Sequence, residues 1–77
     1  MDRELKKVIR GSWTADLKES RNPYTGEMRP YVVAYLTKSG DRADYPIRYD
    51  DGRIAYNDHN PPRDKRRAVE AVMLAAM

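Results

Sequence analysis

A run of basic residues at 63–67 has the clearest binding chemistry in the chain. It reads Arg63-Asp64-Lys65-Arg66-Arg67 and opens a C-terminal segment that is predicted to be helical. Cations in the first turns of a helix oppose its dipole, at a cost of about 0.3–1 kcal/mol each when exposed. Helix N–H groups together with Arg and Lys side chains make a good phosphate site. The run therefore favours contact with a phosphate backbone or an acidic surface. The alternative is a solvated helix face whose arginine stems pack on tyrosine rings.

Tyrosine is the main aromatic residue, with six Tyr, one Trp and no Phe. On a sheet beside basic residues, tyrosine rings can stack on bases or form a protein-binding face. Tyr31 and Tyr35 fall on one face of a predicted strand and are candidates for an exposed aromatic patch. Tyr24 lies in a predicted turn and is expected to be exposed. The other three are in step with isoleucines and are expected in the core: Tyr45, Tyr49 and Tyr56.

Residue types that enzymes use are sparse. His59 is the only histidine, and no Ser, His and Asp grouping has the spacing of a catalytic triad. Asp50 and Asp51 are typical of a hairpin turn. The absence of cysteine excludes disulfides and thiolate metal sites, and no glycine-rich phosphate loop is present. We therefore expect no enzyme activity, no metal site and no cofactor.

The basic charge is concentrated at the two ends of the chain. The 77 residues carry 15 Lys and Arg against 12 Asp and Glu, a formal net charge of +3. Residues 1–10 and 61–77 each hold four cations and two anions, whereas residues 11–60 are nearly balanced. The length predicts one small domain over 1–77. No apolar run is long enough to span a bilayer and no secretory signal is evident, so a cytoplasmic protein without membrane contact is expected.

Hydrophobic periodicity predicts an α+β fold. Residues 2–10 read as a short amphipathic helix, because Leu5, Val8 and Ile9 have i, i+3, i+4 spacing and Gly11 can terminate it. Alternating and β-branched residues predict four strands, and a 16-residue apolar-striped helix follows. The strands are predicted over 12–20, 29–38, 43–50 and 53–57, and the helix over 62–77. Asp51-Gly52 is a two-residue hairpin signal. The expected α-β-β-β-β-α order is an antiparallel meander sheet with both helices packed on one face.

The end of the predicted C-terminal helix is apolar on all sides. Seven consecutive residues, 71–77, carry no polar side chain. A helix that is apolar all round is normally buried all round, which favours a homodimer or a docked partner. The predicted interface residues are Val72, Met73, Leu74 and Met77. The alternative is a frayed terminus whose small alanines cost little when exposed.

Two segments resemble parts of known nucleic-acid-binding families. Lys65-Arg66-Arg67-Ala68, with small residues after it, resembles the final helix of double-stranded-RNA-binding domains. The resemblance implies that Lys65, Arg66 and Arg67 bind phosphates across the major groove. That family's Gly-Pro-x-His loop is missing from this chain. The Asn-Pro-Tyr-Thr-Gly turn at 22–26 is similar to a turn in the arm-binding domain of phage-type integrases, which has three strands and a helix.

The leading hypothesis is a small, basic, non-enzymatic module that binds nucleic acid, DNA or RNA, or a nucleic-acid-handling complex. Its predicted contact residues are Arg63, Lys65, Arg66, Arg67, Lys6, Lys7, Arg10, Tyr31 and Tyr35. The alternative is a phage- or mobile-element-type effector that inhibits an acidic host protein of the defence or transcription machinery. Because Arg and Tyr are also hot-spot residues of protein interfaces, composition does not separate the two. A third possibility is a structural homodimer built on the C-terminal helix.

Overall fold

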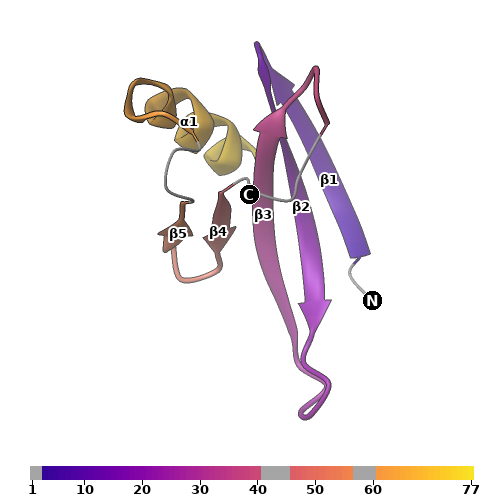
Figure 1. Cartoon of the computed structure of the whole chain (residues 1–77). Coiled ribbons are helices and arrows are strands. Elements are labelled where there is room, and N and C mark those ends of the chain that lie inside the picture. The colour runs from indigo at the N-terminus through magenta and orange to yellow at the C-terminus, as the bar shows by residue number, and fades with distance from the viewer. Residues whose placement is uncertain (1–2, 41–45, 57–60) are drawn as a thin grey trace.

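Five antiparallel strands and a C-terminal helix make up this protein in a computed structural model that describes residues 3–40, 46–56 and 61–77. The strands are β1 (Arg3–Arg10), β2 (Trp13–Arg21), β3 (Met28–Leu36), β4 (Ile47–Tyr49) and β5 (Ile54–Ala55). A 3-10 turn, η1 (Arg63–Lys65), leads into α1 (Arg66–Ala76). The strands lie in the sheet in chain order, β1-β2-β3-β4-β5 (Figure 1). The predicted antiparallel meander with a C-terminal helix is confirmed.

The predicted helix over residues 2–10 is wrong, because this segment forms β1, antiparallel to β2. Val8 packs toward the core, whereas its neighbour Ile9 is 60% exposed, and this is the period-two alternation of a strand. A β-bulge in the first half of β1 shifts the register there. Leu5 lies in the bulge, has no register partner in β2 and is 45% exposed, so its helix-like spacing to Val8 does not mark a shared buried face. Pairing with β2 also gives the backbone groups of this segment stable hydrogen bonds, whereas an isolated nine-residue helix is only marginally stable in water.

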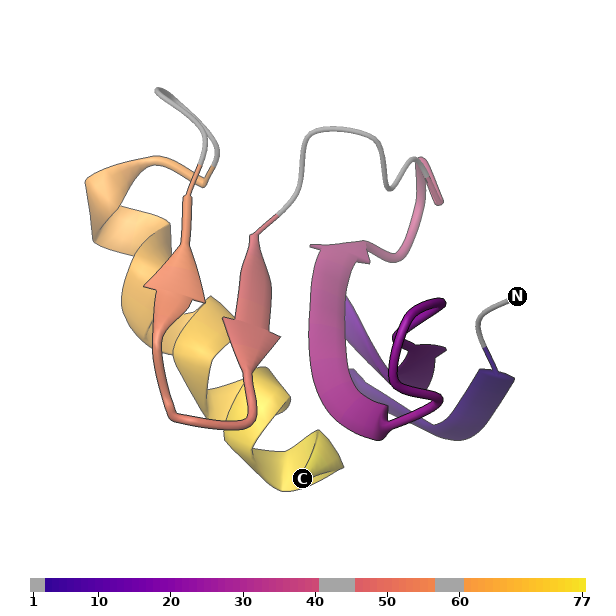
Figure 2. The same cartoon turned by 90° about the horizontal axis from the view of Figure 1, so that it is seen from below.

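The core lies between α1 and one face of β2 and β3. Its buried members are Trp13, Ala15, Val32, Ala34, Val69, Val72, Met73 and Ala76. The helical members recur at i, i+3, i+4 and i+7, so a single stripe of α1 covers the sheet. In Figure 2, α1 and the β4–β5 hairpin form one side of the molecule and the three long strands form the other.

This packing buries some residues of the apolar C-terminal segment and leaves others exposed. Val72 and Met73 belong to the core of the same chain, so they cannot contact a partner while the domain is folded. Leu74 is 63% exposed and Met77 is 49% exposed. The predicted interface is therefore reduced to Leu74 and Met77, and a homodimer through them stays a prediction. No helix among the described residues has the length and apolarity to cross a membrane.

The opposite face of the sheet is buried only near one end of β2 and β3. Tyr35 is 5% exposed there, so it is not part of an exposed aromatic patch. Tyr31, on the same face, is half-buried, as are Tyr49 and Tyr56, which were expected in the core. Tyr45 and the connector with His59 lie outside the described residues.

Two hairpins define the uncovered end of this face. The β2–β3 hairpin extends past the core, and all of residues 21–30 are exposed (Figure 1). The β4–β5 hairpin closes through hydrogen bonds from Gly52 N–H to the Tyr49 carbonyl (3.0 Å) and from Tyr49 N–H to the Arg53 carbonyl (2.8 Å). Gly52 has φ +88°. The connection is therefore a three-residue loop with a left-handed glycine, and the predicted two-residue loop is wrong.

Candidate functional site

Three exposed cations lie at the start of α1, and a fourth, on β1, lines a pocket with one of them. We name these four residues the basic end: Arg10, Arg63, Lys65 and Arg67. Arg10 closes β1 and Lys65 closes η1, and both line one pocket of about 490 Å³. The rest of its lining is mainly apolar or turn residues: Gly11, Ser12, Trp13, Leu36, Pro62 and Ala68. The fold thus brings a cation from the first strand and one from the helix start to the same cavity.

The start of α1 has neither a capping side chain nor a first-turn acid to neutralise the positive end of the helix dipole. Lys65, at the N-cap, makes no capping side-chain hydrogen bond, and the first turn of α1 holds no acidic residue. Pro62, at the N-cap of η1, likewise provides no capping side chain. Among residues 61–65, which the structure describes, the acid is Asp64 within η1. Helix dipole and side-chain cations therefore add at this surface, which makes it attractive to anions.

Lys6 and Lys7 lie away from the basic end. Lys6 Nζ donates a hydrogen bond to the carbonyl of Ala75 (3.3 Å), at the opposite end of α1. Lys7 lies on the face of the sheet away from α1, where its Nζ is 3.8 Å from a carboxylate oxygen of Glu4. The sequence analysis placed both lysines in one contact surface with the helix start. In the structure, neither Lys6 nor Lys7 lies at the start of α1.

Arg66 is held by contacts within the domain. Its guanidinium carbon lies 4.3 Å from the centroid of the Tyr56 ring, and its Nε donates to the Pro61 carbonyl (3.4 Å). The Tyr56 hydroxyl donates to Glu70 (2.5 Å). Burial, this hydrogen bond and the negative charge of Glu70 together raise the pKa of Tyr56 to about 12. For Arg66, packing on a tyrosine ring is thus the observed role.

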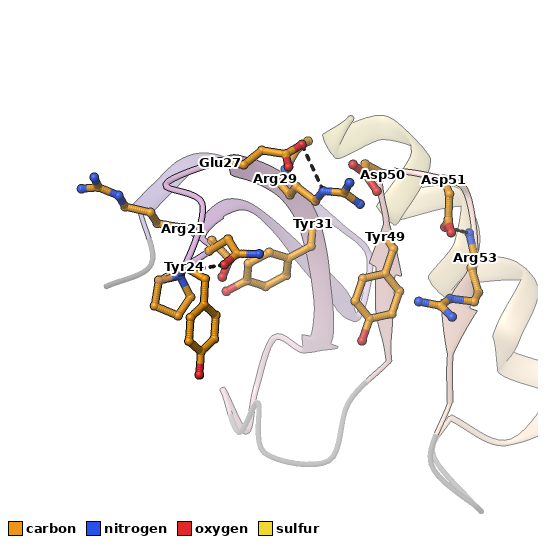
Figure 3. A pocket seen from close by; sticks show the side chains of 13 residues that line it. Arg21, Tyr24, Glu27, Arg29, Tyr31, Tyr49, Asp50, Asp51 and Arg53 are labelled. Atoms are coloured by element: carbon orange, nitrogen blue, oxygen red, sulfur yellow. Dashed lines mark hydrogen bonds and ion pairs between the residues drawn. The ribbon is translucent and has the colours of Figure 1, made fainter.

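A second pocket, of about 440 Å³, opens between the β2–β3 turn and the β4–β5 hairpin (Figure 3). We name it the tyrosine pocket. Its lining is Ser20, Arg21, Asn22, Pro23, Tyr24, Glu27, Arg29, Pro30, Tyr31, Tyr49, Asp50, Asp51 and Arg53. Tyr31 and Tyr49 are directly opposite each other in the β3–β4 register and share the face away from α1. In Figure 3, Tyr24 and Tyr31 lie on one side of the opening and Tyr49 on the other.

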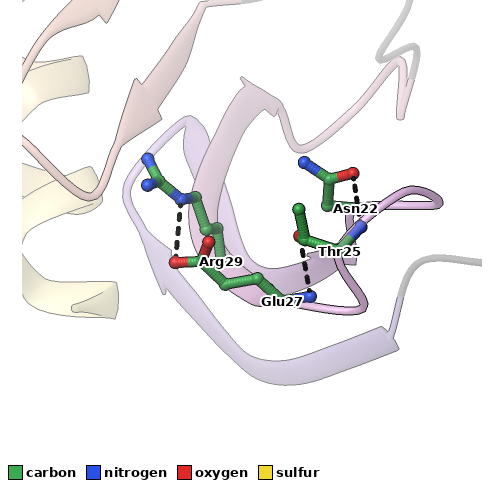
Figure 4. A network of polar contacts seen from close by, with 4 residues as sticks. All are labelled: Asn22, Thr25, Glu27 and Arg29. Atoms are coloured by element: carbon green, nitrogen blue, oxygen red, sulfur yellow. Dashed lines mark hydrogen bonds and ion pairs between the residues drawn. The ribbon is translucent and has the colours of Figure 1, made fainter.

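The turn that carries Tyr24 is fixed by its own side chains (Figure 4). Asn22 Oδ1 accepts hydrogen bonds from the N–H groups of Tyr24 (2.8 Å) and Thr25 (3.3 Å). Thr25 Oγ1 accepts from Glu27 N–H (3.2 Å), and Gly26 supplies the positive φ, +76°, that lets the chain reverse. Tyr24 is 95% exposed on this turn. Its backbone is therefore set before any ligand arrives.

Charges in the tyrosine pocket balance. The lining holds three arginines and three carboxylates. Arg29 Nε is 3.4 Å from a Glu27 carboxylate oxygen. The Arg53 guanidinium lies over the Tyr49 ring, 4.8 Å from its centroid, and Asp51 Oδ1 accepts a hydrogen bond from Arg53 N–H (2.9 Å). Unlike the basic end, this pocket offers aromatic surface with donors and acceptors but no net charge.

Of the tyrosine pocket, only Tyr31 was predicted to be a contact residue. Arg29, Tyr49 and Arg53 were missed, because Tyr49 was assigned to the core and the two arginines stand apart in the sequence. The available signal was that both turns, 22–26 and 50–52, have a Tyr and an Arg within them or directly beside them. Pairing of β3 with β4 is what joins these two turns into one site.

Comparison of the chain with protein-family models, with curated proteins and with solved structures gives no match. Within residues 3–40, 46–56 and 61–77, no cluster of His, Cys, Asp or Glu is arranged to hold a metal ion.

Proposed function

We propose that this protein is a small nucleic-acid-binding module that contacts the phosphate backbone through its basic end. The observation that carries the proposal is that Arg10 and Lys65 line one pocket at a helix start without a cap or a first-turn acid in α1. Cations placed there oppose the helix dipole and lower the stability of the fold. A bound phosphate reverses this, because its charge is favourable to the cations and the dipole alike.

Arginine and lysine contribute differently to such a surface. Arg10, Arg63 and Arg67 can each present a planar pair of N–H donors to two phosphate oxygens, whereas Lys65 acts as a point charge. Contacts of this kind position a nucleic acid without reading its sequence. Each cation that neutralises a phosphate also releases a counterion, so the affinity falls as the salt concentration rises.

The test is fluorescence anisotropy with labelled single- and double-stranded DNA and RNA at about 50–200 mM salt. Affinity is expected to fall steeply with salt for the preferred nucleic acid. The Lys65→Gln/Arg67→Gln variant should weaken binding to unrelated sequences equally and flatten the slope of log affinity against log salt by about two.

A variant with the same charge change serves as the control. Lys7 and Lys18 lie on the face of the sheet away from α1, so Lys7→Gln/Lys18→Gln removes two cations but leaves the basic end intact. It should keep most of the affinity. Absence of binding at low salt, or equal losses in the two double variants, would contradict the proposal. A specific protein recovered from a nuclease-treated lysate would then favour the effector function.

A further inference from the structure

The tyrosine pocket and the basic end differ in charge, so they suit different parts of a ligand. Three arginines and three carboxylates cancel in the tyrosine pocket, and Arg29 is already within ion-pair distance of Glu27. Such a lining has no net attraction for a phosphate backbone. A ligand group that is neutral, planar and polar at its edges fits it better.

We infer that the tyrosine pocket holds an unpaired nucleobase from a single-stranded segment, an inference that rests on the proposed function. The pocket volume, about 440 Å³, is within the range of roughly 300–1,000 Å³ typical of small-molecule sites. Every base has a π-face that stacks on an aromatic ring. Base edges carry both donors and acceptors, and the pocket matches them with the guanidinium of Arg29 and the carboxylate of Asp50.

The position of Tyr49 supports stacking. Arg53 lies over one face of its ring, and Figure 3 places Arg53 and Tyr31 on opposite sides of Tyr49. Tyr49 itself lines the pocket, so its ring is within reach of a base that enters there. The contact with the guanidinium also favours this orientation of the Tyr49 ring, which makes the ring a better ordered stacking surface.

The turn at 22–26 supplies a second ring that is already ordered. Tyr24 is 95% exposed, yet the hydrogen bonds of Asn22 and Thr25 fix the backbone that carries it. Little backbone entropy remains to be lost when a ligand binds against it.

An extended peptide fits this site less well. Strand addition requires unpaired backbone groups at a sheet edge. The floor of the pocket is instead formed where Tyr31 and Tyr49 are paired in the β3–β4 ladder, inside the sheet. A peptide could contact the pocket only through side chains, without the backbone hydrogen bonds that give strand addition its affinity.

The experiment compares a short labelled oligodeoxythymidine with an abasic oligonucleotide of equal length and charge, by anisotropy at about 150 mM salt. Wild-type protein should prefer the probe with bases by about tenfold. Tyr24→Ala, a change at an exposed turn position that leaves the core intact, should reduce this preference. Tyr49→Ala should abolish it, whereas Tyr49→Phe should retain it.

Lys65→Gln/Arg67→Gln separates the two proposals. It should lower the affinity for both probes and leave their ratio unchanged. Equal affinity of the wild-type protein for both probes, with salt-dependent binding intact, would overturn the base pocket alone. If neither probe binds while double-stranded DNA or RNA does, the base pocket fails and the proposed function stands; if no nucleic acid binds even at low salt, both fail.

A direct measurement settles the pocket in either case. Adenosine and thymidine, which carry no phosphate, should shift the NMR signals of Tyr24 and Tyr49, and an absence of shifts overturns the inference. Shifts caused by an aromatic peptide but not by either nucleoside would identify a protein-binding pocket instead.

Discussion

The guanidinium of Arg66 covers the ring of Tyr56, whose hydroxyl in turn donates a hydrogen bond to Glu70. Arg66 and Glu70 are separated by one turn of α1, so both contacts attach the same turn of the helix to the residue that follows β5. This attachment positions the helix start, and with it the cations of the basic end, relative to the sheet.

Titration of Tyr56 should make the protein less stable at high pH. Its pKa is raised from 10.0 to about 12, chiefly by burial and then by Glu70, so the unfolded chain loses this proton at a lower pH than the folded one. The contribution of protonated Tyr56 to the unfolding free energy is therefore fully present below pH 10, and it is lost as the pH rises to about 12. Tyr56→Phe should remove this part of the pH dependence of the unfolding free energy. In a tyrosinate absorbance titration it should delete a step near pH 12, which Tyr24→Phe should leave in place.

Met73 and Leu74 are neighbours in sequence with opposite environments. Met73 is fully buried against the sheet, whereas Leu74 is 63% exposed. Met73→Ala should lower the unfolding free energy by about 2–5 kcal/mol, because it leaves a cavity in a thin core. Leu74→Ala should change it by less than about 0.5 kcal/mol. Urea denaturation measures both. Comparable losses in the two variants would mean that Leu74 is also covered, for example in a dimer.

Asn22 should govern the order of the turn that carries Tyr24. Asn22→Ala removes the acceptor for the N–H groups of Tyr24 and Thr25 and should cost about 1 kcal/mol. The amides of Tyr24 and Thr25 should then exchange with solvent faster. Asn22→Asp keeps an acceptor oxygen at the same position and should retain most of the protection. Unchanged exchange in Asn22→Ala would show that backbone hydrogen bonds alone hold the turn.

Lys6 should stabilise the C-terminal end of α1. Its ammonium donates to the Ala75 carbonyl, where the helix dipole is negative. Lys6→Gln should therefore lower the unfolding free energy by about 0.3–1 kcal/mol at low ionic strength, and less at high salt. Lys38→Gln, an equal change of charge at an exposed residue beyond β3, should have a smaller effect. A salt-independent loss in Lys6→Gln would point to packing of its stem rather than to charge.

Strands β2 and β3 were predictable because the alternation of apolar and polar residues and the turn residues between them indicate the same hairpin. Trp13 and Ala15 alternate with polar residues, and Asn22 and Gly26 mark the reversal that follows. The first strand, 3–10, was not predictable, because its three apolar residues have helical spacing and the bulge near Leu5 interrupts the two-residue alternation of a strand. For the candidate site, the cations of the helix start could be predicted from charge alone. The tyrosine pocket could not, because it depends on the β3–β4 register, which no local pattern encodes.

Every strand of the meander pairs with its neighbour in the chain, so the sheet forms through connections of ten residues or fewer, at small entropic cost. The apolar face that contains Trp13 and Ala15 nevertheless has no cover until Val69, Val72 and Met73 dock on it. Those residues follow all five strands, so a ribosome makes them after the strands. During synthesis, a sheet that forms before α1 docks therefore exposes its apolar face to solvent and to other chains. Docking of α1 is the step that makes the domain cooperative, and slow docking would make the nascent chain prone to aggregate.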